Sequence, residues 1–290
     1  MIDRQSYVGR FAPSPTGPLH LGSLYTALAS FLDARSKQGL WLLRIDDLDT
    51  PRNIIGAADN IVRTLDTFGL HWDGAIAYQS QMLADYQEAL EKLLNKHILY
   101  PCTCSRKDLS TVYSGHCRDQ QKSPESAYSY RIKTDEKVIS FVDELQGLIS
   151  YNLADYGDFI LKRKDHVFAY QFAVVIDDNR QLINHVVRGA DLLESTPRQI
   201  YLQQKLALNT PSYMHVPIIV DAQGYKLSKQ TLATAVDLSH PNLVIFELLT
   251  LLKQNPPRTI QQASVRELLE WGIENWTPSK LENCLSISQR

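Results

Sequence analysis

The sequence contains no apolar run that approaches the roughly 18 residues of a membrane-spanning helix, and residues 1–9 lack the apolar core of a signal peptide. These absences argue against membrane proteins and secretory precursors, so we expect a cytoplasmic protein with no membrane partner. No internal repeat or low-complexity linker interrupts the 290 residues, of which 44% are hydrophobic and 21% charged. Such a chain can bury a substantial core, and we expect it to act as a monomer.

The chain also lacks an excess of positive charge. Lys and Arg number 30 against 32 Asp and Glu, which gives a net charge of −2. This balance excludes a global electrostatic attraction to nucleic acid, so any RNA contact must come from a local basic patch. The candidates are Lys162, Arg163 and Lys164, or the pair Arg118 and Lys122, although each set also fits an ordinary solvated surface.

Cysteine is scarce as well, with four in the chain. In a cytoplasmic protein these residues are expected to be reduced or metal-bound rather than paired in disulfides. Cys102, Cys104 and Cys117 form a Cys-x-Cys pair followed by a third cysteine, which is typical of a zinc site that lacks only its fourth ligand. Chance clustering of free thiols is the alternative, and Cys284 lies far from the group.

The most informative segment is residues 10–23, Arg-Phe-Ala-Pro-Ser-Pro-Thr-Gly-Pro-Leu-His-Leu-Gly-Ser. It joins an expected strand at residues 7–12 to an expected helix at residues 22–37, which Gly39 is expected to end, and a second strand is expected at 41–45. This pattern predicts a parallel βαβ unit. The unpaired N–H groups and the dipole at the helix start favour a bound phosphate, to which His20 would add a side-chain donor. A tight loop without a ligand is the alternative for this turn alone.

A second candidate phosphate site lies near the other end of the chain. Lys226-Leu227-Ser228-Lys229 follows the apolar run 216–220 and a turn at 221–224. Two ammonium groups on one loop can clamp triphosphate oxygens, although such a string alone is usually solvated surface.

Together, these two segments resemble the nucleotide-binding motifs of class I aminoacyl-tRNA synthetases. Further motifs at residues 9–17, 43–49, 169–178 and 187–191 narrow the resemblance to the glutamyl branch, over about residues 7–240. Because the chain ends 61 residues after Lys229, we expect no anticodon-binding domain. This combination resembles the truncated branch of the family, the glutamyl-queuosine tRNA(Asp) synthetases.

The resemblance implies that the enzyme activates L-glutamate with ATP to glutamyl-adenylate in the absence of tRNA. It further implies transfer of glutamate to the queuosine base in the anticodon loop of tRNA(Asp), with Mg²⁺ accompanying ATP. Three alternatives stay open: a divergent glutamyl-tRNA synthetase that charges an acceptor end, a non-catalytic paralogue that binds an amino acid or RNA, and a nucleotidyltransferase acting on another small substrate.

The resemblance also assigns site residues. The expected catalytic residues are His20, Lys226 and Lys229. The expected ATP-binding residues are Pro13, Thr16, Gly17, His20, Gly22, Ser23, Lys226, Leu227, Ser228 and Lys229. The expected glutamate-binding residues are Arg10, Ala12, Ser14, Asp46, Tyr170 and Arg188. For the two arginines, the alternative is a structural ion pair with a neighbouring aspartate.

Chemistry supports the glutamate set, because a dicarboxylic amino acid needs guanidinium groups for its carboxylates and an acid for its ammonium. Asp46 stands where the family usually has glutamate. Its side chain is one methylene shorter, so its oxygens reach roughly 1.5 Å less far toward the ammonium.

For the fourth zinc ligand, ordinary zinc chemistry suggests His116. If residues 113–117 were helical, however, Tyr113 and Cys117 would share a face, whereas His116 would diverge from Cys117. The family resemblance also indicates Tyr113. We therefore expect a structural zinc ion held by Cys102, Cys104, Tyr113 and Cys117.

The expected fold class is α/β, a Rossmann-type synthetase core with a zinc-binding insertion and a small helical C-terminal region. The expected divisions are residues 1–99 and 169–240 for the two halves of the core, 100–168 for the insertion, and 241–290 for a helical region that contacts the tRNA stem. Asp49-Thr50-Pro51 is expected to begin a helix that reaches Leu65, and a further helix is expected at 80–97. Residues 137–142 suggest a strand, the Ser195-Thr196-Pro197 segment a helix start, and the residues before Lys226 a strand.

Overall fold

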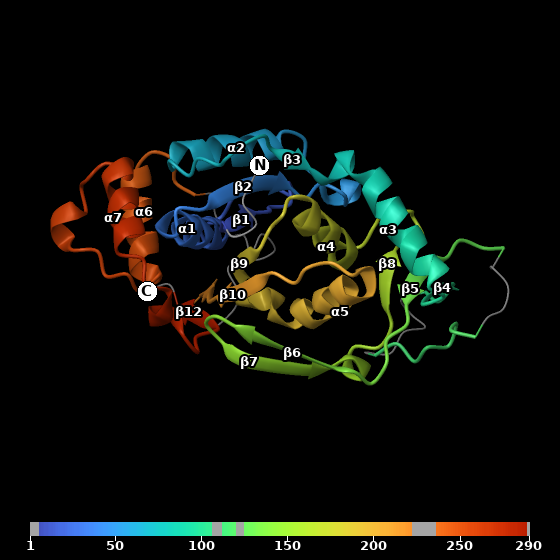
Figure 1. The fold of residues 1–290 in the computed structure, drawn as a ribbon. Helices are drawn as coiled ribbons and strands as arrows, with labels where there is room; N and C mark the ends of the chain where they lie inside the picture. Colours follow the sequence, from blue (N-terminus) through green and yellow to red (C-terminus); the bar gives the residue numbers. More distant parts are fainter. Residues whose placement is uncertain (1–5, 106–111, 120–124, 222–235, 289–290) are drawn as a thin grey trace.

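A computed structural model describes residues 6–105, 112–119, 125–221 and 236–288. Figure 1 shows an elongated molecule with strands at its centre, α6 and α7 at one end, and β4, β5 and β8 toward the other. The predicted α/β class is confirmed. Within the described ranges, no helix is both long enough and apolar enough to span a bilayer.

The first half of the core is the expected βαβ unit. β1 (Val8–Phe11) pairs in parallel with β2 (Leu40–Ile45), and α1 (Leu21–Ser36) connects them. A short third strand, β3 (Ala77–Tyr78), extends this sheet beside β2. The apolar face of α1 is fully buried against the sheet, as its three- and four-residue spacing predicts. These elements agree with the sequence prediction to within a residue or two.

The end of α1 differs in one detail from the prediction. The left-handed residue after the helix is Gln38, with φ of 54°, rather than Gly39. Gly39 is required for a different reason, because a Cβ there would lie 2.6 Å from the Cβ of Tyr7. The glycine therefore permits close contact with the segment that leads into β1.

The second half of the core contains α4 (Tyr170–Arg180), β9 (His185–Gly189), α5 (Thr196–Leu206) and β10 (Ser212–Val216). Pro197 lies in the first turn of α5, as predicted, and β9 and β10 are parallel. The apolar run 172–176 lies inside α4. Asn184 joins the two halves: its backbone N–H donates to Val8 O at 3.1 Å, and its Oδ1 accepts from Val8 N at 2.8 Å.

The residues between the two halves of the core form a separate sheet and a hairpin. β4 (Leu99–Cys102), β5 (Ser129–Ile132) and β8 (Phe159–Lys162) form a separate antiparallel sheet. The hairpin of β6 (Val138–Asp143) and β7 (Gly147–Asn152) instead joins the core sheet through the pairing of Asp143 with Tyr213. The hairpin therefore brings Asp143 into contact with the second half of the core.

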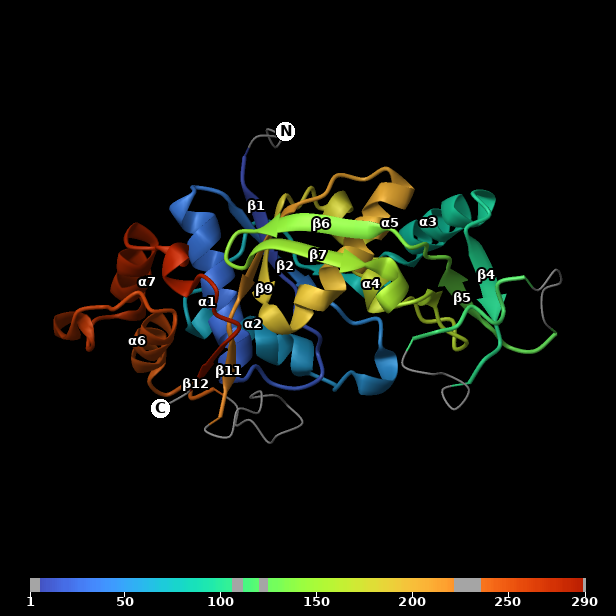
Figure 2. The ribbon, with the colours of Figure 1, turned by 90° about the horizontal axis from the view of Figure 1, so that it is seen from below.

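The C-terminal region is helical, as predicted, and ends in a strand that was not predicted. α6 (Pro241–Leu251) and α7 (Val265–Glu274) pack against each other, and α7 also packs against α1. β12 (Ser286–Ser288) then pairs in parallel with β11 (Ile218–Val220), and the two lie side by side in Figure 2.

Two further helices connect these parts, and the start of one differs from the prediction. α3 (Leu83–Asn95) matches its expected position. The helix expected from Asp49 is wrong at its start, because Thr50–Arg52 forms only a 3₁₀ turn and α2 (Ala57–Thr67) begins after Gly56. The Ile54 N–H donates to Pro15 O at 2.9 Å. This bond holds the segment against the turn that contains Pro15, so the helix begins only after it. Other 3₁₀ turns span Gln79–Gln81, Leu153–Asp155, Ala190–Ser195, Arg258–Ile260 and Pro278–Leu281.

Candidate functional site

A cavity of about 340 Å³ lies where the start of α1 meets the ends of β1 and β9. Every residue predicted to bind ATP or glutamate that falls in the described ranges lines it, except Gly17. The lining residues from that prediction are Arg10, Ala12, Pro13, Ser14, Thr16, His20, Gly22, Ser23, Asp46, Tyr170 and Arg188. Lys226, Leu227, Ser228 and Lys229 lie outside the described residues. Most residues of the predicted ATP site and of the predicted glutamate site therefore line the same cavity.

The N-terminus of α1 forms one side of the cavity, and His20 caps it. The Nδ1 atom of His20 accepts from the Ser23 backbone N–H at 3.2 Å. A neutral ring then carries its proton on Nε2, which lies 2.9 Å from the Ser23 hydroxyl oxygen. This capping role was not predicted from the sequence. In this tautomer Nε2 donates to the Ser23 hydroxyl, so a ligand that uses this ring proton would replace that bond.

Arg10 of β1 does not enter the cavity as an isolated cation. Its Nε donates to Asp178 Oδ1 at 3.2 Å, and Nη2 donates to Asp178 Oδ2 at 3.4 Å. Both side chains are at least nine-tenths buried. The structural ion pair considered from the sequence is thus present, with an aspartate of α4 as partner.

Asp46 belongs to the same buried cluster. Its Oδ1 accepts from Arg44 Nε at 2.8 Å, and Arg44 Nη1 donates to Asp178 at 2.7 Å. Asp177 lies 3.7 Å from Arg44 Nε. Two guanidinium groups, those of Arg10 and Arg44, thus face three carboxylates.

The three carboxylates of this cluster outnumber the two guanidiniums, and their pKa values differ from those of exposed aspartates. Burial raises the pKa of Asp46 to about 6, although Arg44 opposes this shift. Burial also raises the pKa of Asp177, whereas Arg10 and Arg44 overcome burial and lower that of Asp178. Because Asp46 lines the cavity, the excess negative charge lies where a ligand cation could compensate it.

Arg188 of β9 has a different environment. Its guanidinium donates to His215 Nε2 at 3.0 Å, Gln199 Oε1 at 2.8 Å and Thr196 Oγ1 at 2.7 Å. A longer contact of 3.5 Å reaches the Leu192 carbonyl. Among the described residues, no carboxylate forms an ion pair with Arg188, whose hydrogen-bond partners are all neutral.

Several residues that shape the cavity were not among the predicted site residues. Asp178, Arg44 and His215 hold the predicted side chains, and Asp191 lines the cavity directly. A sequence signal existed for Asp178, because two consecutive aspartates end an otherwise apolar helix and need buried partners.

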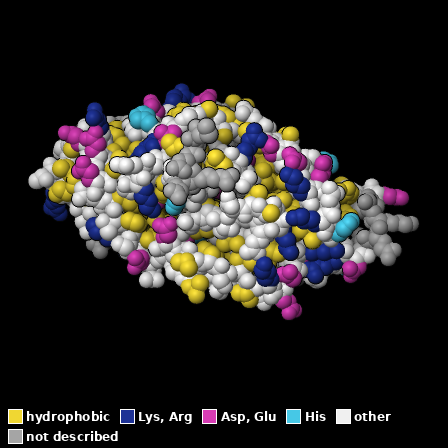
Figure 3. Space-filling model, viewed as in Figure 1, with side chains coloured by type: hydrophobic (Ala, Val, Ile, Leu, Met, Phe, Trp, Pro, Cys, Tyr) yellow, Lys and Arg dark blue, Asp and Glu magenta, His cyan; other side chains and the backbone are white. Residues whose placement is uncertain are grey.

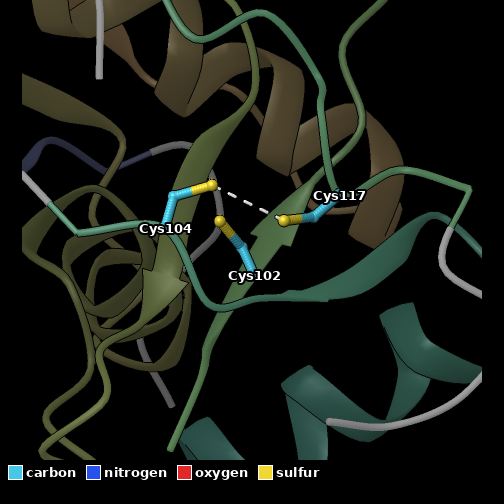
Figure 4. Close-up of side chains that lie close together, drawn as sticks. All are labelled: Cys102, Cys104 and Cys117. Carbon is cyan, nitrogen blue, oxygen red and sulfur yellow. Dashed lines mark hydrogen bonds between the residues drawn. The ribbon is translucent and has the colours of Figure 1, made fainter. Parts of the chain in front are cut away.

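A second candidate site lies in the sheet of β4, β5 and β8. The thiols of Cys102, Cys104 and Cys117 lie within 4.8 Å of one another, and Figure 4 shows their sulfur atoms turned toward a common centre. The Cys104 and Cys117 sulfurs are 3.6 Å apart. Two ligands in a tetrahedral zinc–thiolate site are separated by about 3.8 Å, given zinc–sulfur bonds of about 2.3 Å. The Cys104–Cys117 separation therefore fits two thiolates that share a zinc ion, and the third thiol lies close enough to join them.

The phenol of Tyr113 completes this cluster. Its hydroxyl oxygen lies 3.4 Å from Cys102 Sγ and 3.7 Å from Cys104 Sγ, and it accepts from the Cys117 backbone N–H at 3.0 Å. His116 is exposed, and the group of potential metal ligands found among the described residues does not include it.

The helical argument for Tyr113 was wrong, however, although the residue lies where it was expected. Tyr113 forms an isolated bridge with Gly157, and residues 116–119 form a turn. Gly157 has a φ of 64°, and a Cβ there would lie 2.7 Å from the Tyr113 carbonyl oxygen. The backbone of Gly157, rather than a helical repeat, therefore sets the position of the phenol.

The candidate RNA-binding cations have local partners. Arg118 donates to the buried carboxylate of Asp158, which indicates a structural role, and Lys122 lies outside the described residues. Figure 3 shows the face of the molecule seen in Figure 1, and Lys and Arg side chains gather there over α3, α5 and β8. Lys162 at the end of β8 donates to Gln87, and Arg163 pairs with Asp165.

Comparison with known proteins agrees with this geometry. Residues 7–243 match the family described as tRNA synthetases class I (E and Q), catalytic domain. A glutamyl-Q tRNA(Asp) synthetase of Neisseria meningitidis serogroup A is 48% identical over 288 residues, which cover 95% of this chain and 97% of the relative. The enzyme of the same name from Pseudomonas aeruginosa is 44% identical over 98% of both chains.

A solved structure supports the fold assignment. The glutamate-tRNA synthetase of Elizabethkingia anophelis superposes with a TM-score of 0.83 and 25% identity, covering 99% of this chain and 68% of that chain. The chain therefore belongs to the class I tRNA synthetases (E and Q) and, within them, to the glutamyl-Q tRNA(Asp) synthetases, a family of ligases.

Proposed function

We propose that this enzyme activates L-glutamate with ATP to glutamyl-adenylate without tRNA, and then transfers glutamate to the queuosine base in the anticodon loop of tRNA(Asp). One observation carries the first step: the capped N-terminus of α1, the guanidiniums of Arg10 and Arg188, and the carboxylate of Asp46 line a single cavity. The names of the most similar relatives support the second step.

The cavity offers a complement for each charge of glutamate. Arg188, whose charge has no carboxylate partner among the described residues, is the principal group for a substrate carboxylate, with Arg10 beside it. Asp46 carries the surplus negative charge and would accept the ammonium. Tyr170, at the start of α4, is 39% exposed and would close the pocket around the side chain.

The reaction needs positioning more than proton transfer. An oxygen of the glutamate α-carboxylate attacks the α-phosphorus of ATP, and the bond from that phosphorus to the bridging oxygen breaks, which releases pyrophosphate. The carboxylate is already ionised at neutral pH, so no general base is required. His20 Nε2 and the first N–H groups of α1 would contact phosphate oxygens. Lys226 and Lys229 would stabilise the charge that develops on pyrophosphate, and Mg²⁺ would accompany the nucleotide.

In the second step, a hydroxyl oxygen of the queuosine base would attack the carbonyl carbon of the adenylate and form an ester. The bond from that carbon to the phosphate oxygen breaks, AMP leaves, and the hydroxyl proton passes to solvent. The candidates for RNA contacts are Lys162, Arg163 and Lys164, at and directly after the end of β8. Zinc bound by Cys102, Cys104, Tyr113 and Cys117 would stabilise the insertion rather than take part in the chemistry, because three thiolates make a poor Lewis acid.

We further propose that the chain is organised as two core halves, residues 1–99 and 169–240, an insertion at 100–168 and a helical region at 241–290. The proposal for the second step is tested with radiolabelled glutamate and two preparations of tRNA(Asp), with and without queuosine. The expected result is label on the modified tRNA alone, stable to removal of the 3′ terminal adenosine. Label that depends on that adenosine would instead indicate a glutamyl-tRNA synthetase.

A further inference from the structure

Arg188 is surrounded by acceptors that leave its charge intact. The residue is 4% exposed, and the four described hydrogen bonds of its guanidinium go to a histidine nitrogen, an amide oxygen, a hydroxyl and a backbone carbonyl. Arg10, in contrast, shares its charge with Asp178 through two hydrogen bonds. The two arginines of the cavity are therefore held in chemically different ways.

His215 of β10 can act as an acceptor only if its proton is on the other ring nitrogen. Asp143 ensures this: its Oδ2 lies 2.6 Å from His215 Nδ1, which leaves Nε2 unprotonated and directed at Arg188 Nε. Both side chains of this pair are fully buried. Burial lowers the pKa of His215 to about 4, and the charge of Arg188 also disfavours a second proton.

Asp143 is itself held in place. It ends β6, and its carboxylate accepts the backbone N–H groups of Leu145, Gln146 and His215 at 3.0 to 3.3 Å. Gln199 is fixed in the same manner, since its amide nitrogen donates to Gln171 Oε1 at 2.8 Å, which leaves its own oxygen facing Arg188. The histidine and the amide that accept from the guanidinium thus each have a defined orientation.

We propose that His215, oriented by Asp143, and Gln199 are positioning residues that fix Arg188 through neutral acceptors, so that its full positive charge remains available to a carboxylate of the substrate. This inference rests on the proposed activation of glutamate. It extends the glutamate site to a hairpin and a helix whose residues do not line the cavity.

A matched pair of variants at position 215 tests this inference. H215N keeps a donor near the position of Nδ1 but loses the acceptor for Arg188, whereas H215Q keeps an acceptor near the position of Nε2. The measurement is the ATP–pyrophosphate exchange reaction, with KM determined separately for glutamate and for ATP. We expect H215N to raise the KM for glutamate about tenfold above that of H215Q, with equal KM for ATP and equal melting temperature.

A second variant remains informative even if both changes at position 215 prevent folding. Q199E places a carboxylate against Arg188 with little change of shape, so it should neutralise the guanidinium and raise the KM for glutamate at least about tenfold. Q204E is the control on the same helix, because Gln204 is exposed and accepts from Lys137 instead of contacting Arg188.

The outcomes separate this inference from the proposed function. Equal KM values for glutamate in H215N and H215Q, or a Q199E enzyme with the KM of Q204E, would overturn the positioning role. A wild-type enzyme that shows no exchange with glutamate would instead refute the proposed function itself.

Discussion

Arg10 and Asp178 stand 168 residues apart in the chain and form a buried ion pair, with Arg10 Nε 3.2 Å from Asp178 Oδ1. The same carboxylate accepts from Arg44 Nη1 at 2.7 Å, so one side chain of α4 neutralises cations from β1 and β2. The pair therefore connects the two halves of the core at the edge of the proposed glutamate site.

Removal of the Asp178 carboxylate should lower the free energy of unfolding. D178N leaves two buried guanidiniums with less compensating charge, and breaking such a pair costs about 3 kcal/mol of unfolding free energy. The measurement is chemical denaturation followed by circular dichroism. The control is E270Q, which breaks the exposed pair of Arg266 with Glu270 on α7 and should leave the denaturation midpoint unchanged. Equal midpoints for the two variants would contradict the account.

Affinity for glutamate should weaken in mild acid because of Asp46. Its pKa is raised to about 6 by burial, so the carboxylate gains a proton as the pH falls through that value. If the ionised form binds the substrate ammonium, the KM for glutamate should rise about tenfold at a pH about one unit below that pKa. The folded state binds this proton more tightly than the unfolded chain, so protonation of Asp46 favours folding and does not cause acid unfolding.

D46N provides the control for this titration. The amide cannot ionise, so the variant should have a raised KM at neutral pH that stays constant as the solution is acidified. A pH profile of KM in D46N that parallels that of the wild type would assign the titration to another group.

Lys229→Ala should lower the rate of adenylate formation. A group that stabilises charge in the transition state typically contributes about 100-fold or more to kcat. Stability should be unaffected, because the ammonium is proposed to contact nucleotide rather than protein. The rate of pyrophosphate exchange and the melting temperature are the two measurements. An exchange rate equal to that of the wild type would remove Lys229 from the mechanism.

The cysteine cluster should hold one zinc ion per chain. Elemental analysis of the purified protein should find zinc in the wild type and in C284S, because Cys284 lies outside the cluster, but not in C117S. Y113F should retain less zinc than the wild type after dialysis against a chelator, since it removes the phenol oxygen near the three thiols. Zinc retention by Y113F equal to that of the wild type would exclude the phenol as a ligand.

The elements with strong local signals were predictable from the sequence. The 3.6-residue periodicity of α1 and the Pro197 start of α5 both depend on residues close in the chain, and both appear where expected. The local signals at Asp49 predict the start of a helix, but the structure has a proline-containing turn there and α2 begins later. A contact from Ile54 to the distant turn at Pro15 decided that region instead.

The partners of the predicted site residues could not be read from the sequence. The paired aspartates of α4 signal a need for buried partners, but the sequence does not say which partners Asp178 finds, and His215 looks like an ordinary member of a strand. The roles of both depend on contacts that form only when distant segments of the core fold together. Chemistry alone could predict which side chains a glutamate site needs. It left a structural ion pair open for both arginines, and the structure shows this pair for Arg10 but, among the described residues, not for Arg188.

The most direct test of the central claim is ATP–pyrophosphate exchange without tRNA, measured with glutamate, aspartate and glutamine in turn. If one cavity binds ATP beside a dicarboxylic amino acid, exchange should occur with glutamate and should be far slower with the other two. Exchange that requires tRNA, or that proceeds equally well with glutamine, would contradict the account.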